Sequence, residues 1–385
     1  DLCNDLPSKP MRILRMFLWS LPALVTLLVI AVALYFRFSP RIGSNPEGAR
    51  LARIQSSPNY REGKFQNVVE TDMSIPFKGL LKVLGNMITG GNGQEPTDTI
   101  PTVPFDPVAW AHVPDTAIAV SWFGHSSLLL KVDGMTFLTD PVFGERASSF
   151  SFLGPKRFNY DRHMSVDQLP HVDVVLLSHD HYDHLDHETI LLLKDKVHRW
   201  IMPLGVGAHL EYWGVPASEI SEHDWWESVQ VGPVKLTLAP SRHFTGRSLT
   251  NRFSTLWGAW ALEGRTKRMF FGADSGFSPS YKEIGDKLGP FDLALLECGA
   301  YNENWANIHM MPEETAQAAV EVKARVLMPI HWAKFNLALH PWKEPVERVS
   351  VKAKELGLTL LTPRIGRIVN GPDMSLSERW WDEVK

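Results

Sequence analysis

A dense group of imidazole and carboxylate side chains constrains this chain more than any other feature. It lies in the run Ser178–Asp186, which reads SHDHYDHLD. Neutral imidazole suits zinc and similar divalent ions, and a carboxylate adds charge and can bridge two metals. The run directly follows the apolar segment Val174–Leu177, so we expect it at the end of a buried strand. Such a density of ligand-type side chains predicts a metal site built on His179, His181, Asp183 and His184.

Three later apolar segments deliver a histidine or an aspartate just past their carboxyl ends. His243 follows one of them, Asp274 the second and His331 the third. Strands that end together at one edge of a sheet would bring these side chains to a single site, and seven ligands are enough for two ions. Two metals about 3.5–4 Å apart lower the pKa of a water between them and stabilise attacking and leaving oxygens. We therefore expect two Zn²⁺, with iron or manganese as open alternatives.

The N-terminal part of the chain carries a second signal, a stretch without charged residues from Met16 to Phe36. As a helix it spans roughly 31 Å, close to the hydrocarbon thickness of a bilayer. We expect a tail over residues 1–15 and a retained membrane anchor over 16–36. A cleavable signal peptide and a buried core helix are the alternatives. Basic residues flank the stretch on both sides, so the positive-inside rule assigns no orientation.

Residues 37–117 are expected to connect the anchor to a folded domain and to pack on that domain. Prolines between Pro96 and Pro114 and the glycines of Gly90–Gly93 break any long element there. From residue 118 to 385, apolar runs alternate with helical patterns, which favours a layered α/β domain with helices covering sheets. The expected strands are Ile118–Phe123, Ser126–Val132, Met135–Leu138, Val172–Leu177, Val234–Ala239, Ser254–Leu262, Arg268–Gly272, Leu293–Leu296, Val326–Ile330 and Thr359–Leu361, and the expected helices are His187–Lys196, Pro279–Leu288, Pro312–Val322 and Pro345–Leu356.

The charge balance argues against nucleic acid as a partner. The formal net charge is -4 and the isoelectric point lies near 6.5. Neither value fits the basic surface by which proteins bind the phosphate backbone.

The His-x-His-x-Asp-His run, with the later His, Asp and His, resembles the metallo-β-lactamase superfamily. Within it, the chain is similar to N-acylphosphatidylethanolamine-hydrolysing phospholipase D and its bacterial relatives. The resemblance covers roughly Ile118 to Pro345 and implies a four-layer αβ/βα sandwich with the metals at one edge of two sheets. The segments that carry the narrower likeness are Trp122–His125, Thr139–Pro141, Gly154–Phe158, His181–Asp186, Asp224–Glu227, Leu256–Gly258, Gly289–Asp292 and Gly299–Tyr301.

The resemblance also implies residue roles. The first metal would take His179, His181 and His243. The second would take Asp183, His184 and His331, and Asp274 would bridge the two. His309 matches a histidine that lies near the substrate phosphate in those enzymes. Asp140 matches the aspartate that orients the metal loop, and we expect His125 and Ser178 to support the ligands by hydrogen bonds. The other histidines receive no role: His112, His163, His171, His187, His198, His209, His223 and His340.

These features together predict a binuclear metal-dependent hydrolase. The expected reaction is metal-hydroxide attack on a phosphodiester of an N-acylphosphatidylethanolamine-like lipid, with Asp183 or Asp274 taking up a proton and His309 donating a hydrogen bond. One alternative is a lactonase or other carboxylic-ester hydrolase, which a pocket without an imidazole or cation near the metals would favour. A second is a non-catalytic, metal-stabilised membrane scaffold. The anchor departs from the phospholipase pattern, in which the fold's own surface meets the membrane.

Overall fold

The computed structural model describes residues 9–74, 76, 79, 85, 93–248 and 250–385. The chain forms two compact units, Asp1–Ile42 and Gly43–Lys385.

The first unit consists of helix α1 (Lys9–Phe38) and the short 3-10 helix η1 (Pro40–Ile42). Helix α1 extends beyond the predicted range 16–36 at both ends. Its part Ser20–Phe38 has a mean hydropathy of 2.2, and none of it is buried. By length and composition this helix could cross a membrane, and a signal sequence near an N-terminus meets the same criteria. The membrane anchor therefore stays a prediction.

The second unit contains two seven-stranded sheets with the same arrangement. In each, four strands pair antiparallel and the remaining ones continue in parallel, so several carboxyl ends lie at one edge. In spatial order, the first sheet is β16 (Ile368–Asn370), β3 (Ala119–Trp122), β4 (Leu128–Val132), β5 (Met135–Thr139), β6 (Val174–Leu176), β7 (Trp200–Pro203) and β8 (Ile220–His223). The second is β15 (Thr359–Leu360), β14 (Val326–Ile330), β13 (Leu293–Glu297), β12 (Arg268–Phe271), β11 (Ala259–Glu263), β10 (Val234–Ala239) and β9 (Ser228–Val231).

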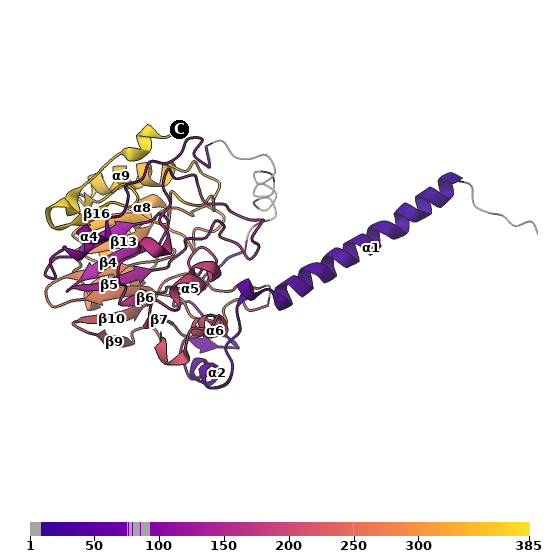
Figure 1. Ribbon diagram of the computed structural model, residues 1–385, viewed down its shortest axis with the longest axis horizontal. Helices are drawn as coiled ribbons and strands as arrows, with labels where there is room; N and C mark the ends of the chain where they lie inside the picture. Colours follow the sequence, from indigo (N-terminus) through magenta and orange to yellow (C-terminus); the bar gives the residue numbers. More distant parts are fainter. Residues whose placement is uncertain (1–8, 75, 77–78, 80–84, 86–92, 249) are drawn as a thin grey trace, which may run out of the picture. The chain divides into compact units, whose positions relative to one another are not determined.

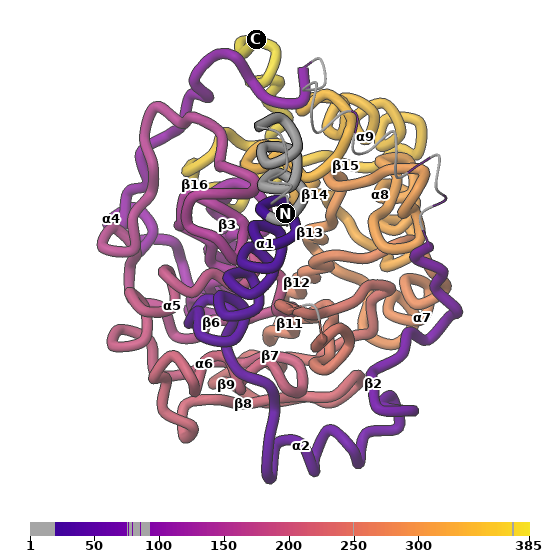
Figure 2. The backbone as a smooth tube through the Cα atoms, turned by 90° about the vertical axis from the view of Figure 1, so that its right-hand side faces the viewer, coloured from indigo at the N-terminus to yellow at the C-terminus, as the bar shows by residue number. Residues whose placement is uncertain are grey.

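Helices cover the two outer faces of the sheets, as Figures 1 and 2 show. On one flank lie α4 (Pro107–Ala111), α5 (His187–Leu193) and α6 (Gly207–Tyr212); on the other lie α7 (Ser280–Lys287), α8 (Pro312–Glu321) and α9 (Glu344–Glu355). Side chains alternate between two cores, because successive residues of a strand point to opposite faces. Leu128 and Leu130 belong to the core that includes the second sheet, whereas Leu129 packs with Trp110 and Ile190 of the outer helices. The predicted αβ/βα sandwich is confirmed.

The ten predicted strands and the four predicted helices all correspond to observed elements, although one strand begins later than predicted. β10 and β14 have the predicted bounds. The strand predicted from Ser254 begins only at Ala259, because the preceding residues bond elsewhere: the Gly258 amide donates to Ser178 O at 3.1 Å. Within residues 118–385, the prediction missed helix α6 and the short strands β7, β8, β9 and β16, which have three or four residues each.

Residues 43–117 belong to the second unit and contain α2 (Gly48–Gln55) and the small hairpin β1 (Tyr60–Arg61) and β2 (Lys64–Phe65). Arg50 of α2 forms ion pairs of 2.8 Å with Glu211 and with Glu222. The predicted boundary at residue 117 stays a prediction.

Candidate metal centre

The candidate ligands come from loops at one edge of the two sheets, and several of these loops have unusual backbone geometry. His125, Asp140 and His331 have positive φ angles of 56°, 34° and 66°. This region is unfavourable for residues with a side chain and persists only where the surroundings impose it. Here, backbone hydrogen bonds between a loop of the first sheet and a loop of the second impose it. The His331 amide donates to His125 O at 3.0 Å, and the His125 amide donates to Trp332 O at 3.1 Å.

A first group brings together three imidazoles, His179, His181 and His243. His181 Nδ1 lies 2.9 Å from His179 Nε2 and 3.2 Å from His243 Nε2. The His243 Nδ1–H donates to Ile308 O at 3.0 Å, so its Nε2 carries a lone pair toward the other two rings. Lone pairs that face one another in this way are the arrangement that a shared cation requires.

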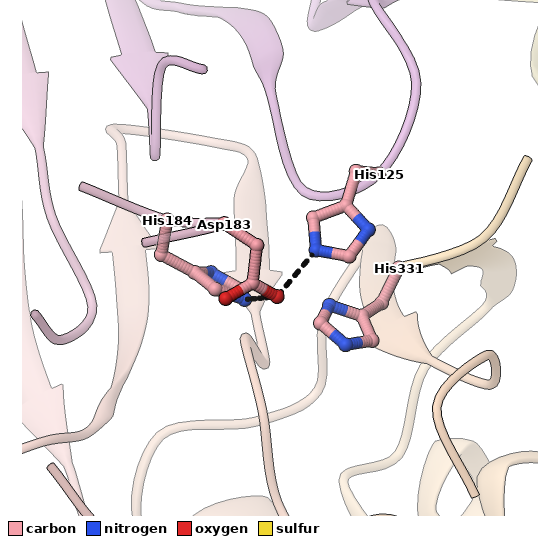
Figure 3. Close-up of side chains that lie close together, drawn as sticks. All are labelled: His125, Asp183, His184 and His331. Atoms are coloured by element: carbon pink, nitrogen blue, oxygen red, sulfur yellow. Dashed lines mark hydrogen bonds and ion pairs between the residues drawn. The ribbon is translucent and has the colours of Figure 1, made fainter. Parts of the chain in front are cut away.

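A second group contains Asp183, His184 and His331, with His125 beside them, and Figure 3 shows the four side chains turned toward one another. Asp183 Oδ2 lies 2.9 Å from His125 Nε2 and 3.4 Å from His184 Nε2. His125, which the sequence assigned only a supporting hydrogen bond, thus lies inside a group whose atoms could hold an ion.

Asp274 lies between the two groups. Its Oδ2 is 3.2 Å from His184 Nε2, 3.7 Å from His243 Nε2 and 3.8 Å from His179 Nε2. Its Oδ1 is 3.0 Å from His331 Nδ1. One carboxylate therefore touches rings of both groups, as a bridging ligand would.

The protonation states of the first group fit metal ligation, whereas His184 of the second group differs: burial opposes its charged ring, but Asp274 and Asp183 outweigh burial and raise the pKa of His184 well above 6.5. Burial, reinforced by neighbouring histidines, lowers the pKa of His179 well below 6.5, and burial also lowers the pKa of His181 and of His243. Neutral imidazoles are the form that binds a divalent cation. Burial opposes ionisation of Asp274, yet His184 and His331 hold the pKa of Asp274 well below its usual value.

Buried atoms without hydrogen-bond partners point the same way. Among the described residues, His184 Nε2, His331 Nε2 and Asp274 Oδ1 make no hydrogen bond, although His184 Nε2 and Asp274 Oδ1 lie within 3.0–3.4 Å of other candidate ligands. Leaving such atoms buried and unpaired costs about 1–3 kcal/mol each, and a shared cation removes that cost. The residues present therefore fit two divalent ions bound by nitrogen and oxygen.

Comparison with known proteins places this site in a family. The family model described as "Beta-lactamase superfamily domain" matches residues 135–332. The chain belongs to the metallo-β-lactamase superfamily. It is 41% identical over 343 residues to the protein Rv0906 of Mycobacterium tuberculosis, with 87% of this chain and 91% of that protein covered.

Two further similarities describe this superfamily member more closely. A Caenorhabditis elegans protein, N-acyl-phosphatidylethanolamine-hydrolyzing phospholipase D 1, is 36% identical over 236 residues, which cover 58% of this chain and 66% of that protein. The structure of Igni18, a metallo hydrolase from Ignicoccus hospitalis, superimposes with a TM-score of 0.53 at 16% identity, covering 66% of this chain and 99% of that one, and shows the shared fold. The chain is a metal-dependent hydrolase of the superfamily that resembles the phospholipase D relatives.

Asp140 fixes the loop that carries the candidate ligands His179 to His184 by hydrogen bonds to Ser178 and His184. It is fully buried, and its Oδ1 accepts from the Ser178 amide at 2.8 Å. Its Oδ2 accepts from Ser178 Oγ at 2.5 Å and lies 2.7 Å from His184 Nδ1. The Nδ1–H of His184 thus points at a carboxylate, which directs the Nε2 lone pair toward Asp183 and Asp274.

His309 adjoins the metallo-β-lactamase centre from another side, and the sequence did not reveal its partner. Its Nδ1 lies 2.6 Å from Glu297 Oε2, and Glu297 is fully buried. Burial disfavours the charged ring, but Glu297 outweighs it and raises the pKa of His309 to about 9. Glu297 ends the apolar strand β13, so the strand-end argument that found Asp274 applies to it as well.

The sequence also missed the residues that fix the first group. Asp180 stands between His179 and His181, is fully buried, and accepts from the Gly246 amide and Thr255 Oγ1 at 2.8 Å each. His209, to which the sequence gave no role, lies 3.3 Å from Asp180 through its Nε2. The Asn67 side chain makes two hydrogen bonds with the His243 backbone: Nδ2 donates to His243 O at 2.8 Å, and Oδ1 accepts from the His243 amide at 3.0 Å. No local pattern reveals these contacts, because every partner is distant in sequence.

Proposed function

We propose that this hydrolase cleaves the phosphodiester of N-acylphosphatidylethanolamine-like phospholipids on the phospholipase D side. The similarity to the worm N-acyl-phosphatidylethanolamine-hydrolyzing phospholipase D 1, at 36% identity, supports the substrate class. The metal-binding arrangement supports the reaction type, since one carboxylate lies between two imidazole groups.

Two divalent ions are proposed to occupy the site, zinc first, with iron or manganese open. His179, His181 and His243 would hold one, Asp183, His184 and His331 the other, and Asp274 would touch both. When bound, such ions lower the pKa of a water molecule and polarise the phosphoryl oxygen. The residues of the chain supply the geometry: Asp140 fixes the His184 ring, and Ile308 O fixes the His243 ring.

The chain's own carboxylates and His309 complete the reaction. A carboxylate oxygen of Asp183 or Asp274 accepts the proton of the attacking water, whose oxygen forms a bond to phosphorus. The bond from phosphorus to the ethanolamine oxygen breaks, and that oxygen receives the proton. The products are phosphatidic acid and N-acylethanolamine. His309 donates a hydrogen bond to the phosphoryl oxygen, where negative charge builds up.

The partial exposure of His309 favours a phosphodiester substrate over a carboxylic ester. The side chains of His309 and Asp183 are 13% and 15% exposed, whereas that of His184 is fully buried. A substrate that approaches from solvent therefore meets an imidazole beside the candidate ligands. His309 lies in one group with His243 and Asp274. A donor in this position suits an anionic phosphodiester, and its absence would have favoured a lactone.

The test is hydrolysis of N-acylphosphatidylethanolamine by the full-length, metal-loaded protein in detergent, carried out in ¹⁸O-labelled water. We expect phosphatidic acid that carries one labelled oxygen, and loss of that product in His179→Ala. His171→Ala is the matched control, because its side chain is 81% exposed. A protein that binds two metals yet releases no phosphatidic acid contradicts the substrate, and hydrolysis of a lactone would then identify the carboxylic-ester reaction.

Helix α1 is proposed to anchor the enzyme where its lipid substrate resides. The length and mean hydropathy of Ser20–Phe38 support this role. Alkaline carbonate extraction of expressing cells should leave the uncleaved chain in the membrane pellet. A soluble chain whose N-terminus begins after residue 38 would instead identify a signal sequence.

A further inference from the structure

A cavity of about 110 Å³ lies apart from the candidate metal centre. We call it the Lys334 cavity. None of the candidate metal ligands lines it. Its walls include three cationic side chains and several aromatic ones: Phe105, Phe123, Arg157, Tyr160, Arg162 and Lys334.

Lys334 forms the floor of this cavity and is only 3% exposed. Its Nζ donates to Phe123 O at 3.1 Å and to Val142 O at 2.7 Å. An ammonium group has three N–H donors, and no hydrogen-bond acceptor among the residues that the structure describes takes the third; the centroids of the Phe143 and Phe335 rings lie 5.8 and 6.0 Å from Nζ. Burial, increased in effect by Arg157, lowers the pKa of Lys334 to about 7. A buried cation is normally paired, because its desolvation is costly.

No carboxylate in the described part of the chain pairs directly with these cations. Arg157 donates to a backbone carbonyl, Phe143 O, at 2.9 Å. Asp186 and Glu145 act on Arg157 only through longer-range attraction. Burial, followed by the charges of Arg157 and Lys334, lowers the pKa of the neighbouring His163. The lining therefore carries positive charge on Arg157 and on the exposed Arg162, beside the buried amine of Lys334.

The remaining walls are apolar. The Phe123 ring lies 5.7 Å from Phe105 and 5.9 Å from Phe143, measured between centroids, and Met164 lies beside them. A ligand that fills this space needs one anionic end and a slim apolar body. The guanidinium of Arg157 matches the forked geometry of a carboxylate.

We propose that the Lys334 cavity binds a small organic carboxylate with an apolar chain, separately from the substrate of the metal centre. The carboxylate lies against Lys334 and Arg157, and the chain lies against the phenylalanines. This site stands independently of the proposed phospholipid activity.

The position of the cavity connects it to the metal loops. Tyr160 Oη donates to Ala333 O at 2.7 Å, and the Phe158 amide donates to Lys334 O at 2.7 Å. Gly124 has a φ of 84°, and a Cβ there would lie 2.3 Å from Tyr160 Oη, so the wall of the cavity presses against the loop that carries His125. An occupant that draws Lys334 toward itself therefore acts on the segments next to His125 and His331.

The test is isothermal titration of the full-length, metal-loaded protein with hexanoate, with hexanamide as the uncharged probe of the same shape. We expect hexanoate to bind and hexanamide to fail. Arg157→Gln should weaken hexanoate binding at least tenfold, because it removes the forked hydrogen bonds between the guanidinium and the carboxylate. Lys334→Met should do the same. Arg199→Gln, a change of an exposed arginine outside the cavity, should leave the affinity unchanged.

A second arm separates this site from carboxylate binding at the metals. Titration after chelation of the metals should give the same affinity for hexanoate. The proposal is overturned by equal binding of hexanoate and hexanamide, by loss of binding on chelation, or by unchanged affinity in Arg157→Gln. Inorganic phosphate that binds as tightly as hexanoate would overturn the requirement for an apolar chain. If Lys334→Met fails to fold, the affinities of Arg157→Gln and Arg162→Gln for hexanoate still test the proposal, because both changes remove a cation from the cavity.

Discussion

Asp180 offers the sharpest test of how the fold positions the first group of candidate ligands, His179, His181 and His243. The buried carboxylate receives hydrogen bonds from the Gly246 amide and Thr255 Oγ1, and His209 Nε2 lies 3.3 Å away. Asp180→Ala leaves these groups buried without their acceptor. Each unsatisfied donor costs about 1–3 kcal/mol, so we expect the free energy of unfolding to fall by roughly 3–5 kcal/mol. That loss is large against the total stability of a domain.

The same substitution should weaken metal binding, because Asp180 separates His179 from His181 in the sequence and holds their loop against Gly246. Denaturant unfolding of metal-loaded and metal-free protein measures the first effect, and competition with a chelator measures the second. Thr255→Val, which removes only one donor, should lose about 1 kcal/mol. Asp195→Ala, at a side chain that is 80% exposed, is the matched control. If Asp180→Ala stays within 1 kcal/mol of the original protein and keeps its metal affinity, the positioning argument is wrong.

Three further changes test other parts of the structure. Asp274→Asn should lower the bound metal from two ions to one and reduce hydrolysis at least a hundredfold, because the amide cannot supply a charged bridging ligand. Metal analysis and turnover measurements test this prediction. Full activity with two bound metals would contradict it. Gly299→Ala places a Cβ 1.8 Å from His331 O, so the backbone at His331 must move. Metal affinity, measured by competition with a chelator, should therefore fall at least tenfold. The control Gly357→Ala meets no atom within 4 Å but has a φ of 68°, so it should lower stability without changing metal affinity. For Lys334, burial lowers the pKa from 10.5 to about 7, so the unfolded chain binds more protons than the folded chain between pH 7 and pH 10.5, and the free energy of unfolding rises with pH in that range. Relative to Lys334→Met, the original protein should gain about 3 kcal/mol of stability between pH 7 and pH 10 in a buffer without binding anions. A stability difference that does not change with pH would refute the burial of an unpaired cation.

Much of the fold could be predicted because strands and ligands obey one local rule. Apolar runs such as Val234–Ala239 and Val326–Ile330 are strands with those bounds, and His243 and His331 follow them at the same edge. The parallel pairing of β12, β13 and β14 makes this convergence unavoidable, since their carboxyl ends lie together.

The contacts that hold the site could not be read from local patterns. Asp180 meets His209 across 29 positions and Thr255 across 75, and Asn67 meets His243 across 176. Hydrophobic periodicity carries no information about such pairs, since polar side chains find one another only after the sheets have packed. The five-residue delay of β11 has the same origin, because Gly258 bonds to the metal loop and not to a strand.

Glu297 is the one missed residue for which the sequence held a signal. It closes the buried strand Leu293–Glu297 in the same way that Asp274 follows β12. A carboxylate at the end of a fully apolar run is unusual, because buried charges need partners. The structure supplies that partner as His309.

The most direct measurement is the number of metal ions bound per chain, determined by elemental mass spectrometry on the full-length protein after exhaustive dialysis. The structure predicts two ions in the original protein, one in His243→Ala, which loses a ligand of the first group alone, and two in the exposed control His171→Ala. A stoichiometry below one in the original protein, or two ions retained in His243→Ala, would contradict the binuclear centre on which the account depends.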